Sequence, residues 1–171
     1  MISIRTRTYQ TQTKPDTVFA RLHLDVEKVT TLVNPWAANV TDDTTKPWVG
    51  KIDRSDGKFE MLETNASLLP VRILEGNFFD LFVRGEVTSD HDGNASIIDV
   101  RYSLGLQGTL TFLLAYLFTM GLAFIFIGKN DWDGLRGLIP LLLVFDVIPT
   151  LLLIVQLNRI ENKVMELLGV M

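Results

Sequence analysis

The chain of 171 residues contains no cysteine and only two histidines. The absence of cysteine excludes disulfides, zinc–thiolate sites and thiol chemistry. An excess of basic residues is missing too, because 16 Lys and Arg stand against 20 Asp and Glu, for a net charge of −4. A nucleic-acid partner therefore has no electrostatic support.

Charge is also absent from one long stretch. No charged residue occurs in the 27 residues from Tyr102 to Gly128, whereas residues 1–105 carry 12 of the 16 Lys and Arg and 15 of the 20 Asp and Glu. An uncharged run of this length is too long for a buried core helix and is typical of a bilayer crossing. The composition therefore favours a small soluble domain joined to a membrane anchor.

Two apolar segments predict the anchor, an α-helical transmembrane hairpin over residues 105–157. We expect spans at 106–127 and 138–157, each able at about 1.5 Å per residue to cross a hydrocarbon core of roughly 30 Å. The second span contains one charge, Asp146, whose insertion cost of roughly 2.5 to 3.5 kcal/mol is outweighed by fifteen Leu, Ile, Val and Phe residues. The ten-residue connector, 128–137, is long enough only for an antiparallel hairpin.

The orientation of the anchor follows from two observations. The N-terminus has no apolar signal segment that would carry a domain across the membrane. Arg101, Arg159 and Lys163 flank the spans on the terminal side, against Lys129 and Arg136 in the connector. We therefore expect an integral membrane protein with both termini cytoplasmic.

The soluble domain, residues 1–104, is predicted to be α+β, with one helix and about five mostly antiparallel strands. Pro15 and Asp16 form a helix start signal, and apolar residues at steps of three and four continue the helix to Pro35. Apolar–polar alternation and glycine-containing turns predict the strands. They are placed at 2–8, 49–53, 58–62, 82–88 and 96–104, with 71–74 as a further candidate.

The C-terminal segment, residues 158–171, repeats apolar residues at helical spacing, including Ile160, Val164 and Leu167. This pattern predicts an amphipathic C-terminal helix that continues the second span. Its apolar side would lie either on the membrane surface or against the soluble domain.

The order of these elements resembles a group of bacterial membrane proteins that have an N-terminal α+β domain, a C-terminal two-helix transmembrane hairpin and no established activity. The group tends to carry Asn-x-Phe followed by a hydrophobic residue and a Gly before another hydrophobic residue. The matching positions here are Asn77, Phe79, Val83, Gly85 and Val87, with Gly50–Ile52 and Phe59 before them. The chain departs from the pattern at Gly76, Phe78 and Leu81. The resemblance implies the architecture and a place in a bacterial inner membrane, but no catalytic role.

Asp146 is the most informative candidate for a functional residue. Antiparallel pairing of the spans places it level with Thr119 and one turn from Tyr116. An unpaired charge in hydrocarbon is expensive, so we expect a hydrogen bond within the hairpin or a contact with another chain. A proton or ion relay is the alternative, and Pro140 and Pro149 could open a small polar pocket beside Asp146 by kinking the helix.

Two Pro-Trp pairs lie on either side of a polar loop in the soluble domain. Trp36 and Trp48 either line a ligand site or an interface, or cap the core of the sheet. The acidic turn 90–94 superficially resembles a calcium loop but has Arg101 where a bidentate Glu belongs, so we interpret it as a hairpin turn.

These patterns contain no catalytic constellation, metal-binding cluster or cofactor motif. The sequence therefore predicts a membrane-anchored, non-enzymatic accessory or binding module. Its expected partners are the lipid bilayer and, through the hairpin, a protein partner or further copies of the chain. The alternative is a homo-oligomeric transport or proton-relay component that uses the intramembrane Asp146.

Overall fold

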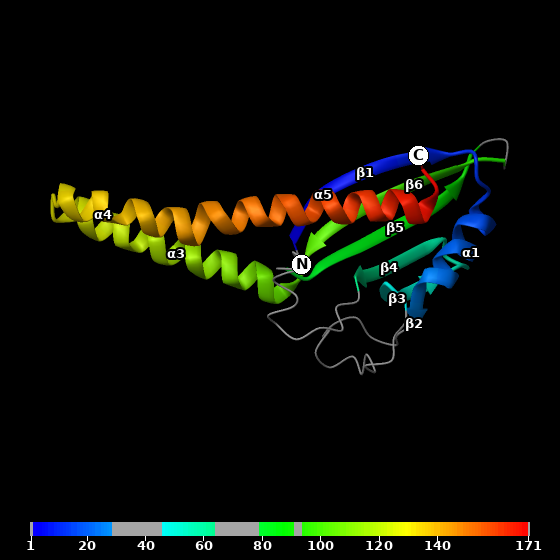
Figure 1. Cartoon of the computed structure of the whole chain (residues 1–171), viewed down its shortest axis with the longest axis horizontal. Coiled ribbons are helices and arrows are strands. Elements are labelled where there is room, and N and C mark those ends of the chain that lie inside the picture. Colours follow the sequence, from blue (N-terminus) through cyan, green and yellow to red (C-terminus); the bar gives the residue numbers. More distant parts are fainter. Residues whose placement is uncertain (1, 29–45, 64–78, 91–93, 171) are drawn as a thin grey trace.

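The computed structural model describes residues 2–28, 46–63, 79–90 and 94–170. Its N-terminal part is a mixed sheet of six strands with order β1-β6-β5-β4-β3-β2, and two long apolar helices extend from one end of that sheet (Figure 1). The strands are β1 (Ile2–Thr11), β2 (Val26–Lys28), β3 (Trp48–Asp53), β4 (Lys58–Glu63), β5 (Leu81–Ser89) and β6 (Ser96–Leu104). All neighbouring strands are antiparallel except β2 and β3.

The sixth strand corrects the predicted count of about five. The helix that starts at Pro15, α1 (Pro15–Asp25), does not continue to Pro35 as predicted. Val26 is already extended, with φ −106° and ψ 121°, and pairs with Trp48 as the first residue of β2. A β-branched residue fits a strand well, and the free edge of β3 supplies the hydrogen bonds that the helix would have made. The candidate strand 71–74 lies outside the described residues.

The remaining strands lie close to their predicted positions because their alternation is strict. On β6, buried residues alternate with Asp99 and Arg101, as a sheet with one covered face requires. Gly85 in β5 is needed for packing: a Cβ there would lie 2.2 Å from the ring of Phe59. A Cβ added at Gly50 would likewise lie too close to Met61, at 2.9 Å from its Cβ. Both of these glycines therefore permit a close approach between neighbouring strands.

The hairpin consists of α3 (Leu106–Gly128), α4 (Trp132–Leu142), a π-helical turn η1 (Leu143–Val147) and α5 (Ile148–Leu168). The connector is only residues 129–131, shorter than the predicted ten. Asn130 takes a left-handed conformation at φ 55°, and Asp131 caps α4 by accepting a hydrogen bond from the Gly134 amide at 2.9 Å. The two arms are long and apolar enough to cross a membrane, with mean hydropathies of 2.3 and 2.7 over the most apolar 18 residues of Gly108–Gly128 and of Trp132–Leu168.

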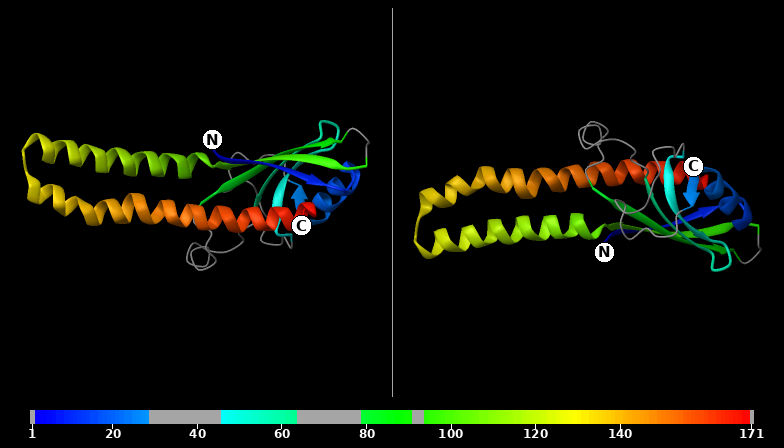
Figure 2. Two further views of the ribbon diagram at one scale, coloured as in Figure 1. Left: turned by 90° about the horizontal axis from the view of Figure 1, so that it is seen from above. Right: turned by 90° about the horizontal axis from the view of Figure 1, so that it is seen from below.

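Helix α5 continues beyond the apolar arm and packs on the sheet. Its second half and α1 cover the same face, on which the main core forms (Figures 1 and 2). The residues that α5 buries there are Leu157, Ile160, Val164, Leu167 and Leu168. Of the two expected places for the C-terminal helix, the structure thus shows the one against the N-terminal domain.

Candidate functional site

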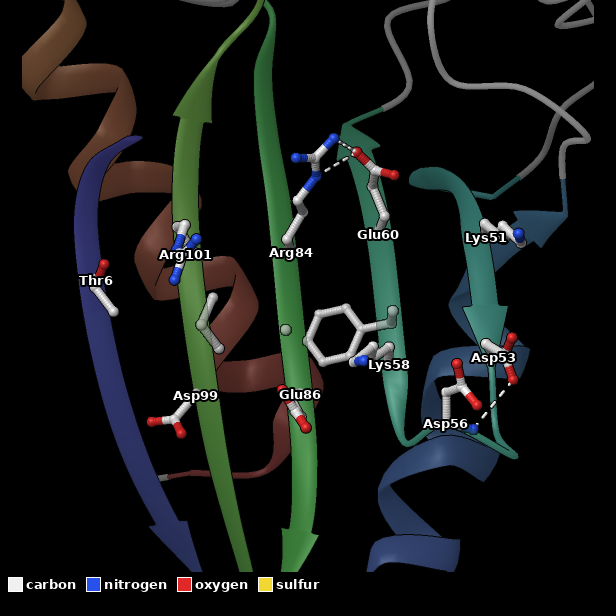
Figure 3. Close-up of a pocket in the computed structure, with 13 residues that line it drawn as sticks. Thr6, Lys51, Asp53, Asp56, Lys58, Glu60, Arg84, Glu86, Asp99 and Arg101 are labelled. Atoms are coloured by element: carbon white, nitrogen blue, oxygen red, sulfur yellow. Dashed lines mark hydrogen bonds and ion pairs between the residues drawn. The ribbon is translucent and has the colours of Figure 1, made fainter. Parts of the chain in front are cut away.

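The sheet face opposite α1 and α5 contains an open cavity of about 430 Å³. Strand register aligns its polar side chains in two rows across the sheet (Figure 3). The first, the arginine row, runs Thr6, Arg101, Arg84, Glu60, Lys51, and the second, the acidic row, runs Thr8, Asp99, Glu86, Lys58, Asp53. Both rows lie on the face that the helices leave open.

Each row contains two like charges directly opposite one another. Arg84 pairs with Arg101, and Glu86 pairs with Asp99. Glu60 accepts a hydrogen bond from Nε of Arg84 at 2.6 Å, while the Arg101 side chain makes no hydrogen bond or ion pair with any described residue. Directly opposed like charges destabilise a sheet, so this arrangement has a cost that a neutral surface would avoid.

The sequence predicts the strand at 96–104 but not this cavity. Alternation along the strand is consistent with Asp99 and Arg101 on its polar side. The rows, however, depend on which strands are neighbours and in what register, and alternation within one strand does not contain that information.

The junction between the apolar hairpin and the sheet is held by polar side chains of α5. The side chain of Gln156, only 2 % exposed, makes two hydrogen bonds to the backbone of Phe79. Its Oε1 accepts from the Phe79 amide at 2.9 Å, and its Nε2 donates to the Phe79 carbonyl at 2.7 Å. A buried amide satisfied in this way fixes both the height and the rotation of α5 at this level.

Two carboxylates continue this attachment on opposite flanks of α5. Glu161 accepts hydrogen bonds from Arg5 at 2.5 Å and Arg7 at 2.8 Å on β1. Glu63, at the end of β4, pairs with Arg159 at 3.0 Å and with Lys163. Partial burial alone would raise the pKa of Glu161, but the two arginines outweigh it and hold the pKa below its usual value of 4.5.

Asp146 lies in the π-helical turn. The rings of Phe118 and Phe145, the residues before Thr119 and Asp146, are 6.5 Å apart, so these two polar residues lie at the same level of the hairpin. Thr119 is 1 % exposed and donates its hydroxyl to backbone carbonyls of its own helix, at 3.1 Å and 3.0 Å. The structure therefore contains no hydrogen bond from Thr119 to Asp146.

The Asp146 side chain is without a partner among the described residues. Its Oδ2 is buried and makes no hydrogen bond, while its backbone carbonyl accepts from the Thr150 hydroxyl at 2.6 Å. Tyr116 is 55 % exposed and makes no hydrogen bond to this carboxylate. Pro149 lies two residues after the end of the π-helical turn and lacks an amide hydrogen. Its missing hydrogen bond explains why the regular helical hydrogen-bond pattern widens here.

The remaining candidates of the sequence analysis are placed as follows. Trp48 is 3 % exposed and belongs to the main core, while Trp36 lies outside the described residues. The middle of the acidic turn 90–94 is also outside them. Within the described part of the chain, no group of three or more His, Asp or Glu residues could hold a metal ion.

Comparison with known proteins leaves this geometry to be interpreted from its own contacts. The chain matches no protein-family model, no curated protein and no solved structure.

The attachment through Glu161 predicts a pH-dependent stability. Glu161→Gln should lower the free energy of unfolding by about 1–2 kcal/mol at neutral pH, because it removes the charge that two arginines bond. Since the folded-state pKa is depressed, this contribution is present above pH 4.5 and is lost as pH falls through the lower, folded-state pKa. The unfolding midpoints of the native chain and the variant, followed by tryptophan fluorescence in mild detergent, should therefore converge on acidification.

Glu166 provides the matched control for this experiment. It is exposed on the same helix and forms no ion pair with a described residue. Glu166→Gln should leave the free energy of unfolding within about 0.5 kcal/mol of the native value. A gap between native chain and Glu161→Gln that stays constant with pH would contradict the assignment.

Proposed function

We propose that the protein is a membrane-anchored, non-enzymatic binding module whose two apolar arms cross a bilayer and whose sheet presents a partner-binding face. The apolar arms support insertion, because only 6 % of the most apolar 18-residue stretch of each arm is buried. Among the described residues, the exposed large apolar side chains outside 106–155 are Ile2, Ile4 and Leu24. A soluble monomer rarely exposes so continuous an apolar surface. The 21 residues of Gly108–Gly128 extend about 31 Å, which matches the hydrocarbon thickness.

The observation that carries the proposal is the continuity of α5. One uninterrupted helix begins in the exposed apolar arm and ends in the core of the N-terminal domain. No flexible linker separates the domain from this arm, so insertion of the hairpin would fix the height and orientation of the sheet relative to the bilayer. A rigid mount of this kind suits a module that presents a surface to a partner in or near the membrane.

The open sheet face is the surface that we assign to the partner. It has a cavity and charged side chains of both signs, including Arg101, which has no ion-pair partner among the described residues. Proteins tolerate locally unfavourable arrangements chiefly where function requires them, and the opposed Arg84 and Arg101 are such an arrangement. The charges of both rows would give specificity to a contact rather than bulk affinity.

Insertion and orientation can be tested with single cysteines, because the chain has none of its own. Lys129→Cys places a thiol in the turn between the arms, and Asp56→Cys places one in the exposed β3–β4 turn. In intact cells, a membrane-impermeant maleimide should label the Lys129→Cys thiol and reach the Asp56→Cys thiol only after the membrane is permeabilised. The reverse pattern would overturn the orientation, and recovery of the chain in the soluble fraction would overturn the anchor.

Partner binding by the sheet predicts a charge-dependent assembly. Native mass spectrometry of the protein from its own membranes in mild detergent should show a heteromeric mass. Arg101→Glu should reduce its abundance at least tenfold, because reversal of a close charge at an interface costs several kcal/mol. Lys14→Glu, an equal charge change at the start of α1, should leave the mass unchanged. A native chain that is monomeric throughout would contradict this assignment.

A second candidate function is favoured by one specific observation, the buried and unpartnered Oδ2 of Asp146 in a π-helical turn. A carboxyl group in the middle of a span costs about 2.5–3.5 kcal/mol or more and is a functional candidate by default. Single π-turns inside α-helices occur frequently at functional sites. Several hairpins arranged around Asp146 would form a homo-oligomeric proton or ion path.

Variants of Asp146 separate the two candidates. If the residue is part of a relay, proteoliposomes should show pH-dependent flux that Asp146→Asn removes, and the native assembly should be a homo-oligomer. If it is an assembly contact, Asp146→Leu should lower the abundance of the native assembly at least tenfold in favour of the monomer. Neither the native chain nor the variant should then show flux. Thr111→Val, at an exposed position on the other arm, serves as the control. An unchanged assembly together with no flux would exclude Asp146 from both roles.

A further inference from the structure

Four cations lie on or beside α5 where its apolar arm ends. They are Arg5 and Arg7 on β1 and Arg159 and Lys163 on α5, and we call them the basic collar. Each pair shares a single carboxylate, Glu161 on one flank and Glu63 on the other. Among the described residues, each flank therefore has two cations beside one carboxylate.

In each pair, one cation is more buried than the other. Arg5 and Arg159 have side chains 26 % and 30 % exposed, whereas Arg7 and Lys163 are 51 % and 48 % exposed. Glu63 and Glu161 themselves are only 9 % and 13 % exposed. The inner cations thus pair with largely buried carboxylates, and the outer cations, Arg7 and Lys163, lie at the surface.

The collar lies at a defined height above the apolar arm. Exposed large apolar side chains on α5 end at Val155, and the helix begins to bury residues in the domain at Gln156. At about 1.5 Å per residue, Arg159 and Lys163 lie about 3 Å and 9 Å beyond Leu157. The polar headgroup layer of one leaflet is roughly 5–8 Å thick, so the collar spans the height of the lipid phosphates.

Apolar side chains border the collar on the side of the arms. Ile2 and Ile4 are 58 % and 37 % exposed at the end of β1, where Ile2 pairs with Leu104, and Leu106 opens α3 with 65 % exposure. Apolar residues beside basic ones are the pattern of a surface that contacts both acyl chains and headgroups. Asp80, next to Gly105, is a further acidic group at this end of the sheet. Counted over the described residues named here, four cations lie near three carboxylates.

We propose that the basic collar binds the phosphate groups of anionic phospholipids in the leaflet next to the domain, with Arg7 and Lys163 as the main contacts. The inference rests on the proposed insertion of the hairpin. The guanidinium of Arg7 offers paired donors to phosphate oxygens, and Lys163 acts as a point charge. The bordering isoleucines and Leu106 select a lipid rather than a free anion, because only a lipid provides acyl chains for them.

The test compares nanodiscs of phosphatidylcholine with nanodiscs that also contain phosphatidylglycerol. Native mass spectrometry of protein released from the mixed discs should show phosphatidylglycerol enriched at least fivefold over its share of the disc. Arg7→Gln combined with Lys163→Gln should abolish this enrichment, and it keeps Arg5 and Arg159, so both buried carboxylates remain paired. Lys14→Gln combined with Lys28→Gln removes the same charge from exposed positions outside the collar and the open sheet face, and should leave the enrichment intact.

The outcomes separate the lipid proposal from the proposed function. A native chain that enters the discs without enrichment, or a control variant that loses as much as the collar variant, overturns lipid recognition and leaves the anchor standing. If inorganic phosphate raises the unfolding midpoint in pure phosphatidylcholine discs as much as phosphatidylglycerol does, the ligand is free phosphate and the proposal is wrong. A chain that stays outside discs of either composition overturns the anchor and lipid recognition together.

Discussion

Burial of the second half of α5 against the sheet is the interaction on which the rest of the structure depends. Each large apolar residue buried there contributes roughly 1.5–3 kcal/mol, and five of them lie on the face that meets β5, β6 and α1. The first half of the same helix is equally apolar but exposed. A single helix thus joins two surroundings, and its docking on the sheet determines how the hairpin projects from the domain.

Polar contacts then select one position of α5 among those that hydrophobic burial alone would allow. Apolar packing tolerates small shifts along a helix, whereas a hydrogen-bonded amide does not. Gln156 is bonded twice to one backbone position, and Glu161 and Glu63 attach the helix to β1 and β4 on either side. Three attachments in different directions prevent both sliding and rotation. The hydrophobic effect supplies the stability here, and the polar groups supply the geometry.

The sequence predicted those features that a single segment determines by itself. Alternation located β5 and β6, and the two long apolar runs located both arms of the hairpin. It failed where tertiary contacts decide: Val26 joins a strand because β3 offers a free edge, which the helical spacing of its neighbours conceals. The cavity required strand order and register, and the attachment of Glu161 to Arg5 and Arg7 joins residues more than 150 positions apart. Pro149 indicated a kink near this place, but the sequence did not predict the π-helical turn itself.

Two unfavourable features lie away from this attachment. Where α5 meets the sheet, carboxylates are matched by cations and the buried amide is satisfied. The unfavourable pairing of Arg84 with Arg101 lies instead on the open sheet face, and the buried Oδ2 of Asp146 lies in the hairpin. Buried polar atoms are nearly always bonded, so an exception calls for an explanation beyond packing. A structure whose stability is secured at one junction can carry such costs elsewhere, and for that reason we place binding on the open face and keep Asp146 as the second candidate.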